Sequence, residues 1–168
     1  MTLADVTIRV ASAADADVLA ASRYRFRTTF DSTRPAAPGA AFENEAAFVG
    51  RAAPLIETFL RGGRWRAWIA EHDGRICGHL FLQLVDKMPN PDPREPERLA
   101  YLTSFFVEPE VRDRGVGAAL MQQLETFAQG GDVEKILIVG TTERSRSLYA
   151  RRGYASAPDL LQKVLTAE

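Results

Sequence analysis

The chain has 168 residues, of which 46% are hydrophobic and 26% are charged, and its formal net charge is −1. This length and composition predict one globular domain over residues 1–168, and the charge gives no reason to expect nucleic acid or an anionic membrane as a partner. The single cysteine, Cys77, excludes an intrachain disulfide and a cysteine-cluster metal site, and its apolar neighbours predict a buried thiol. The first residues show no secretory signal pattern and no apolar run reaches about 18 residues, so a cytoplasmic location is expected.

The chain opens with a predicted strand and helix. Residues 6–11, VTIRVA, alternate and are rich in β-branched side chains, which is typical of a strand. Ser12 and Asp15 then form an S-x-x-D capping box ahead of a helix. The stripe of that helix is formed by Val18, Leu19, Ser22, Phe26 and Phe30. Two prolines and a glycine in residues 31–41, DSTRPAAPGAA, end it.

A second helix is predicted from Asn44 to the glycines at 62–63, with Pro54 kinking or splitting it. Residues 65–85 read as a β-hairpin, because Asp73-Gly74 is a strong signal for a two-residue turn. Four of the nine prolines follow in residues 86–98, DKMPNPDPREPER, where no regular element is expected. Such a long connection inside a compact domain is often functional, although a passive loop is the alternative.

The second half of the chain is more regular. Residues 99–107 predict an apolar strand covered on both faces, and residues 135–141 predict another buried strand. Between them, residues 114–130 predict a helix whose buried stripe is Val116, Leu120, Leu124, Phe127 and Ala128. Residues 143–153 predict a short helix that stops at a glycine, and Tyr154 with residues 160–165 suggests final strands. The predicted order, β-α-α-β-β-β-α-β-α-β-β, is a mixed α/β sheet.

A glycine-rich turn, Gly115-Val116-Gly117, joins the third of these helices to the strand before it. The first turn of a helix presents unpaired N–H groups, which bind anions, and the absence of Cβ atoms lets a ligand approach. Arg112 and Arg114 can add charge-assisted contacts to a pyrophosphate. A dinucleotide fingerprint fails because Leu120 stands where its third glycine would be, and the G-K-[ST] of a Walker loop is absent. By themselves the glycines are equally consistent with a turn that holds no ligand.

A second motif decides between these readings. Arg112–Ala118 matches an [RQ]-x-x-G-x-[GA] loop, and Leu148–Tyr154 matches L-Y-x-x-x-G-[FY] after a further strand. Together with the order of the elements, the pair resembles the GCN5-related N-acetyltransferase (GNAT) superfamily. The resemblance implies a single-domain, mostly antiparallel sheet with helices on both faces, and acetyl-CoA as cosubstrate without a metal. It assigns cofactor binding to Phe105, Phe106, Val107, Arg112, Arg114, Gly115, Val116, Gly117, Ala118, Thr142, Ser145 and Tyr149.

The resemblance also implies that the strand over residues 99–107 splays from the strand over residues 135–141, often at a bulge, with pantetheine in the gap. A backbone N–H near Val107 would polarise the thioester carbonyl. Tyr149 would protonate the departing thiolate, although packing alone would make it a core aromatic. Some members carry a glutamate base at the position of Tyr101, which is a poor base at its usual pKa near 10.

No single base is therefore assigned. Water-mediated deprotonation could end on Glu71, Asp86 or Glu97, and His79 is more often structural in such a strand. The family frequently has an asparagine where this chain has Thr142, which reaches less far toward the pantetheine arm. The remaining cationic cluster is a solvated basic face or a contact for the 3′-phosphate, and it comprises Arg144, Arg146, Arg151 and Arg152.

The predicted function is acetyl transfer from acetyl-CoA to a primary amine by direct attack in a ternary complex. The first two helices and the loops over residues 31–41 and 86–98 are expected to form the acceptor side, and a small-molecule acceptor is favoured over a protein or peptide. Alternatives are another acyl-CoA, a hydroxyl acceptor, or a non-catalytic acyl-CoA sensor. The resemblance also allows a homodimer through edge strands.

Overall fold

The computed structural model describes residues 5–30, 42–139, 142–157, 160 and 163. Five strands form one sheet in the order β1-β2-β3-β4-β5, and only the pairing of β4 with β5 is parallel. The strands are β1 Thr7–Val10, β2 Trp65–His72, β3 Arg75–Asp86, β4 Arg98–Val107 and β5 Val133–Ile138. The helices are α1 Ala16–Phe30, α2 Glu45–Arg61, α3 Val116–Gly130 and α4 Glu143–Arg151, with short 3₁₀ turns η2 Ala13–Asp15 and η3 Pro109–Val111. The mixed, mostly antiparallel α/β fold is thus confirmed.

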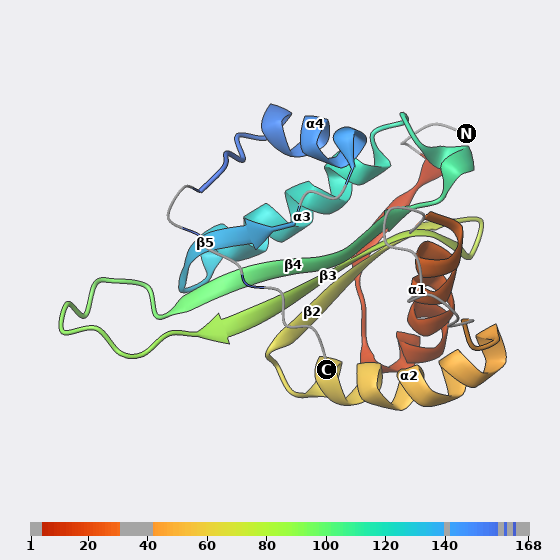
Figure 1. Cartoon of the computed structure of the whole chain (residues 1–168), viewed down its shortest axis with the longest axis horizontal. Helices are drawn as coiled ribbons and strands as arrows, with labels where there is room; N and C mark the ends of the chain where they lie inside the picture. Colours follow the sequence, from red (N-terminus) through yellow and green to blue (C-terminus); the bar gives the residue numbers. More distant parts are fainter. Residues whose placement is uncertain (1–4, 31–41, 140–141, 158–159, 161–162, 164–168) are drawn as a thin grey trace.

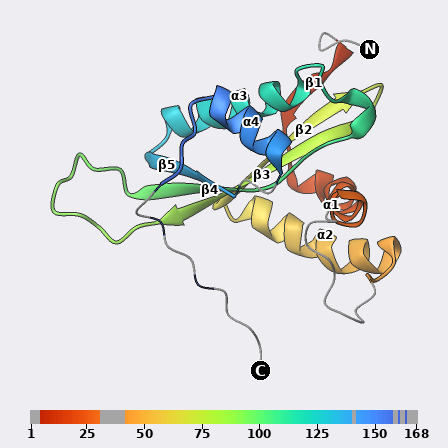
Figure 2. The ribbon, with the colours of Figure 1, turned by 45° about the horizontal axis from the view of Figure 1, so that its top comes forward.

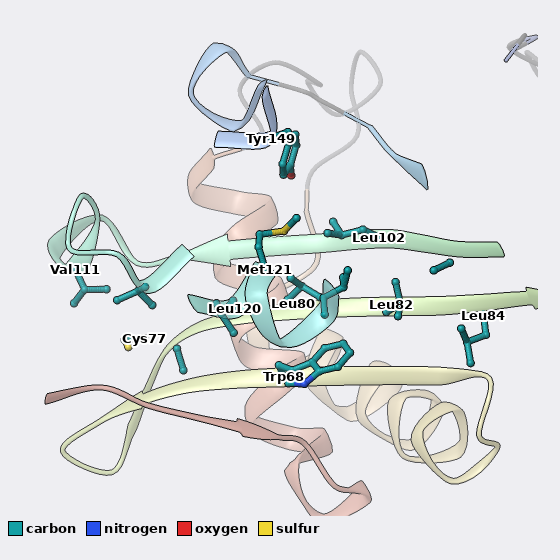
Figure 3. Close-up of a cluster of buried hydrophobic side chains, with 14 residues drawn as sticks. Trp68, Cys77, Leu80, Leu82, Leu84, Leu102, Val111, Leu120, Met121 and Tyr149 are labelled. Atoms are coloured by element: carbon teal, nitrogen blue, oxygen red, sulfur yellow. The ribbon is translucent and has the colours of Figure 1, made fainter. Parts of the chain in front are cut away.

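The helices cover both faces of the sheet (Figures 1 and 2), and each face has its own core. On one face, Ile69 and Phe81 of the sheet pack against α1 and α2, and Leu19 of α1 is fully buried there. On the other face, Leu120 and Met121 of α3 lie over the strands, as Figure 3 shows. The two layers leave β4 in contact with α1 on one side and with α3 on the other.

Local sequence signals explain most of the element boundaries. Asp73 and Gly74 both have positive φ, 50° and 71°, as the tight hairpin turn between β2 and β3 requires. The Asn44 side chain caps α2 by accepting a hydrogen bond from the Ala47 N–H at 2.9 Å. α2 runs unbroken through Pro54, which lies on its exposed side, so a split at that residue is wrong.

The C-terminal part of the sheet differs from the sequence prediction. β5 is half-exposed rather than buried, because it is the edge strand of the described sheet. Residues 154–157 form no strand. The Tyr154 N–H instead donates to the Tyr149 carbonyl at 3.1 Å, so this part of the backbone completes the end of α4. The rest of the predicted final strands lies almost wholly outside the described residues, as does the loop over residues 31–41.

β4 is less completely covered than its apolar sequence predicts. Within it only Ala100, Leu102 and Phe106 are buried, and the residues between them are half-buried. The predicted stripe of α3 is largely correct, but Met121 is also fully buried and Phe127 is only half-buried. Cys77 is buried, and burial raises the pKa of its thiol, as expected for an inert side chain.

The proline-rich connection between β3 and β4 projects beyond the sheet in Figure 1. Lys87 ties the start of this connection to its end, because the Lys87 Nζ atom lies 2.8 Å from the Glu95 carboxylate and 3.1 Å from the Pro96 carbonyl oxygen. The connection leaves the sheet where Asp86 pairs with Arg98, which is the opposite end of β4 from Val107. No helix in the described part of the chain has the length and apolar character needed to cross a membrane.

Candidate functional site

β4 carries a bulge at Ser104. Leu80 of β3 faces Phe105 and the next residue, Phe81, faces Thr103, so Ser104 has no partner of its own in the β3 register. Its φ of 53° lies in the left-handed region, which is uncommon for a residue with a side chain. The expected bulge is therefore present in this strand.

Beyond the bulge, the backbone of β4 turns polar groups away from β3. The Glu108 N–H donates to the Cys77 carbonyl at 2.9 Å, and the register places Val107 opposite Gly78. Because bonded and non-bonded pairs alternate in an antiparallel ladder, Val107 and Phe105 direct their N–H and C=O groups away from β3. Phe106 belongs to the other set, so its backbone faces β3 and its ring packs toward α1, 5.6 Å from Phe26.

The partner on the far side of β4 ends before these groups. The pairing with β5 runs from Arg98 to Leu102, which lies opposite Ile138. Among the described residues, β5 contributes no register partner to Phe105 or Val107. Within the described residues the pairing of β4 with β5 therefore ends before Phe105, which is where the predicted splay would begin. The N–H groups that point to this side of β4 can serve an extended ligand.

α3 follows β4 after the turn η3, and it begins with a glycine rather than a capping side chain. Gly115 occupies the N-cap with φ 85°, a conformation that strongly favours glycine, and it makes no side-chain cap. No acidic residue stands in the first turn. The N–H groups of Val116, Gly117 and Ala118 therefore lie in a helix terminus with partial positive charge.

Gly117 lies inside the helix and has no positive φ. Its missing side chain therefore matters because it leaves room for close neighbours, not because it frees the backbone. A Cβ there would lie 3.4 Å from the Phe105 ring, 3.6 Å from Leu148 and 3.8 Å from Val107. The first turn of α3, the end of β4 and α4 thus converge at this residue. Several residues predicted from two separate motifs meet at one place.

The Arg112 side chain bonds to the end of β4. Its Nε donates to the Val107 carbonyl oxygen at 2.8 Å, and its guanidinium carbon lies 6.0 Å from the centre of the Phe106 ring. Burial and the nearby Arg144 lower the pKa of this guanidinium. Arg114, in contrast, is exposed in the loop before Gly115. The two arginines predicted to share one role therefore occupy different environments.

The predicted cofactor residues on α4 form its N-terminal cap. The Thr142 hydroxyl accepts from the Ser145 N–H at 3.1 Å, and the Ser145 hydroxyl accepts from the Thr142 N–H at 3.1 Å. This reciprocal capping box fixes where α4 begins. Neither side chain is shown to contact a cofactor, so that role stays a prediction.

Most of the cationic cluster on α4 is engaged within the protein. Arg152 forms a two-point ion pair with Glu125 of α3, and its Nε lies 2.8 Å from the carboxylate. Arg144 pairs with Asp113, and Arg151 donates to the Ser147 hydroxyl at 2.6 Å. The fourth member, Arg146, is exposed. Arg152 and Arg144 thus tie α4 to α3 and to the glycine loop, whereas Arg144, Arg146 and Arg151 are exposed, as the predicted solvated face requires.

Tyr149 is buried and its ring lies 6.3 Å from that of Phe105. α4 ends in a Schellman motif: Gly153 has φ 85°, its N–H donates to the Ala150 carbonyl, and the Tyr154 N–H donates to Tyr149. The rings of Tyr149 and Tyr154, 5.9 Å apart, supply the apolar contact of that motif. The L-Y-x-x-x-G-[FY] pattern thus has a structural explanation besides a catalytic one. Burial raises the pKa of the Tyr149 phenol to about 12, which keeps its proton in place at neutral pH.

The structure narrows the list of possible bases. Glu71 is held by Arg9, which lowers the pKa of the carboxyl, and Asp86 lies 2.8 Å from Arg64 at the far end of β4. Tyr101 is half-buried on the face of β4 that looks toward α1, opposite the face of Tyr149. Among the described residues, no group of histidine, cysteine, aspartate and glutamate side chains is placed to hold a metal ion.

His79 is structural, as the sequence favoured. It is fully buried, and burial, with a smaller contribution from Arg23 and Arg25, lowers the pKa of its imidazole to about 3. It bonds two serines that the sequence did not single out as site residues, Ser22 of α1 and Ser104 of β4. The one sequence signal for these two serines was that each places a hydroxyl in a mostly apolar helix stripe or strand.

Known proteins were compared with this chain by sequence and by structure. A family model described as the acetyltransferase (GNAT) family matches residues 26–154. N-acetyltransferase 8 of Homo sapiens is 33% identical over 89 residues, a match that covers 52% of this chain and 37% of that protein. The chain thus aligns with little more than a third of the length of this curated relative.

Solved structures share the fold. A predicted acetyltransferase from Clostridium acetobutylicum, crystallised with acetyl-CoA, has a TM-score of 0.73 at 20% identity and covers 95% of this chain and 96% of its own. A GCN5-related N-acetyltransferase from Ralstonia eutropha JMP134 has a TM-score of 0.72 at 21% identity, with coverage of 95% and 98%. The aminoglycoside acetyltransferase meta-AAC0020, from an uncultured soil sample and in complex with sisomicin, has a TM-score of 0.73 at 11% identity, covering 98% of each chain.

Proposed function

Because this chain belongs to the GNAT acetyltransferase family, we propose that it transfers the acetyl group of acetyl-CoA to a primary amine of a small molecule, by direct attack in a ternary complex. The observation that carries the proposal is that the described pairing of β4 with β5 ends at Leu102, on the side of β4 where the first turn of α3 has no side-chain cap. An activated thioester is the chemistry that acetyl-CoA supplies there.

The residues around α3 support binding of the donor. N–H groups in the first turn of α3 can hold a pyrophosphate, because a helix N-terminus attracts anions. Gly115 lets the chain enter the helix at this point, and Arg114 adds positive charge beside it. The N–H groups of Phe105 and Val107 can bond amide and carbonyl oxygens of an extended ligand. Thr142 and Ser145 stay predicted contacts for the pantetheine arm.

Three residues are proposed to act at the reacting centre. The Val107 N–H, which points away from β3, is proposed to stabilise negative charge that develops on the acetyl carbonyl oxygen, as oxyanion donors do. Tyr149 holds its proton at neutral pH and can donate it to the departing sulfur as the C–S bond breaks. Because a phenol is a weaker acid than a thiol, the proton released by the attacking amine must then restore the Tyr149 phenol. Tyr101 faces the acceptor side and can orient the amine, whose proton leaves through water.

α1 is the proposed acceptor wall. Arg23 of α1 donates to the Ser104 hydroxyl at 3.1 Å, and Arg25 lies 2.9 Å from the Glu108 carboxylate, so this helix contacts β4 on both sides of Val107. The connection over residues 87–97 leaves the opposite end of β4 and is a weaker candidate. A small-molecule acceptor is the preference carried over from the sequence.

Isothermal titration with acetyl-CoA tests the donor half of this proposal. Saturable binding, weakened by coenzyme A as competitor, is expected. No heat and no competition at millimolar acetyl-CoA would contradict it.

A further inference from the structure

The bulge at Ser104 is the point on which the orientation of β4 depends. It separates the stretch that pairs with β5 from the stretch that turns Phe105 and Val107 toward the splay. Ser104 holds a φ of 53° without being glycine, and such a torsion persists only where the surroundings over-determine it. Something other than local preference must therefore hold this residue.

A continuous chain of hydrogen bonds runs through that position. Ser22 Oγ lies 2.7 Å from His79 Nδ1, and His79 Nε2 lies 2.8 Å from Ser104 Oγ. Arg23 Nη1 donates to the same Ser104 oxygen at 3.1 Å. The chain links α1, β3 and β4, which are the three elements that meet on the acceptor side of the bulge.

The direction of each bond follows from burial. Ser22 and His79 are fully buried, and the imidazole is neutral, so it carries a single N–H. Within the described residues, His79 is the only partner recorded for the Ser22 hydroxyl, which must therefore donate to Nδ1. The hydrogen then resides on Nε2 and is donated to Ser104. Both lone pairs of the Ser104 oxygen are thus engaged, one by His79 and one by Arg23.

Aromatic rings restrain the imidazole on its other sides. His79 lies 5.8 Å from the Phe106 ring, 5.6 Å from Phe81 and 6.4 Å from Phe26. Since Phe106 stands between the two residues that face the splay, movement of the imidazole would shift both of them. The network therefore contacts the strand at the bulge and at the residue that follows it by two positions.

We propose that Ser22, His79 and Arg23 are positioning residues that fix the β4 bulge through Ser104 and so orient the N–H groups of Phe105 and Val107 toward the acyl donor. The orienting role rests on the proposed function, whereas the fixing of the bulge does not. None of the three is proposed to contact the thioester.

Two variants interrupt the network at different points. Ser22→Ala removes one oxygen, and His79→Phe keeps a ring of similar shape without its nitrogens. Thr28→Ala is the matched control, because the Thr28 hydroxyl lies on the same helix and donates to its own Tyr24 carbonyl instead. We expect amide hydrogen exchange at Phe106 and Glu108, whose N–H groups face β3, to rise about tenfold in the first two variants of the free protein, which corresponds to about 1.4 kcal/mol, and not in the control.

Kinetics then separate positioning from general stability. Each interrupting variant should lower kcat/KM for acetyl-CoA about tenfold while the KM for the amine changes little. A merely structural role would lower Tm without changing exchange at Phe106 and Glu108 or the kinetic constants, and that result would overturn the proposal. Because Ser22→Ala removes a single oxygen atom, this variant serves the test even if His79→Phe does not fold.

Ser104→Gly distinguishes the hydrogen bonds from the torsion. Glycine adopts positive φ without strain, so this variant keeps the bulge conformation accessible but removes the hydroxyl. Increased exchange is expected if the network fixes the bulge, and wild-type exchange would overturn the inference. If exchange responds as expected while the wild-type protein binds no acetyl-CoA, the proposed function fails and the fixing of the bulge stands.

Discussion

The Nε of Arg112 lies 2.8 Å from the backbone carbonyl oxygen of Val107, so the arginine that opens the R-x-x-G-x-G motif is bonded to the end of β4. A charge-assisted bond of this kind fixes the orientation of the peptide group next to the glycine loop. Arg112 therefore connects the two halves of the proposed donor site, and its role differs from that of the exposed Arg114.

Replacing these two arginines should separate the roles. Arg112→Leu removes a hydrogen bond from a charged donor, worth about 1.5–3 kcal/mol, and should lower kcat/KM for acetyl-CoA by about 10- to 100-fold. Arg114→Leu should raise the Kd for acetyl-CoA by only a few-fold, with most of that effect lost at high salt. Steady-state kinetics at two ionic strengths measures both, and equal salt-dependent effects would show that Arg112 acts as a simple cation.

The first turn of α3 offers a variant with opposite effects on stability and on binding. A carboxylate at Ala118 is favourable to the helix dipole by about 0.3–1 kcal/mol but repels a pyrophosphate. Ala118→Glu should therefore leave Tm unchanged or slightly higher while weakening acetyl-CoA binding at least about tenfold. Ala118→Gln, of the same size without the charge, is the control, and both are compared by titration calorimetry. Similar binding by the two variants would place the pyrophosphate elsewhere.

Tyr149 and Tyr154 provide a matched pair for the proton donor. Both rings belong to the same helix terminus, so a phenylalanine at either position keeps the apolar contact. Tyr149→Phe should lower kcat by about 10²-fold or more with little change in the Kd for acetyl-CoA, because general acids contribute in that range. Tyr154→Phe should leave kcat unchanged. If the two variants have equal kcat, Tyr149 is a packing residue and the Schellman contact explains the motif.

Much of this arrangement follows from local signals. The turn at Asp73-Gly74, the cap at Asn44 and the stop at Gly153 each depend on a residue type whose backbone preference is strong. The positive φ of Gly115 at the start of α3 likewise follows from a residue type whose backbone freedom the motif indicated. These features require no knowledge of the rest of the fold.

Other features depend on long-range contacts and could not be predicted. β5 has an apolar sequence, yet its exposure is set by its place at the edge of the described sheet. The capping role of Thr142 was hidden because the same residue also fits a family position for cofactor binding. The partners of His79 come from positions 57 and 25 residues away, a separation that a sequence pattern does not reveal.

Burial of His79 predicts a loss of stability in mild acid. The folded-state pKa, about 3, lies below the usual value of 6.5, so below pH 6.5 the unfolded chain binds a proton that the folded protein does not. Stability should therefore fall by about 1.4 kcal/mol per pH unit from pH 6.5 downward, or about 2 kcal/mol between pH 7 and pH 5. Urea unfolding at the two pH values measures this difference.

The other histidine supplies the control. The chain has two histidines, so His72→Gln should retain the loss seen in the wild-type protein, whereas His79→Gln should lack it. Asp15, whose pKa Arg9 lowers to about 2, contributes stability that is lost only as the pH falls from about 3.8 toward 2, outside this window. An unchanged pH dependence in His79→Gln would mean that the imidazole is solvated.

The most direct test of the central claim is transfer of an isotope-labelled acetyl group from acetyl-CoA to a panel of amines, with thiol release followed in parallel. The panel should contain small primary amines, amino acids, polyamines, aminoglycosides and lysine peptides. The account predicts labelled product and stoichiometric free thiol with at least one small-molecule amine, and a strong reduction of both in Tyr149→Phe. Tight binding of acetyl-CoA without transfer to any acceptor would contradict it and would identify the protein as a binder of acyl-CoA rather than an acetyltransferase.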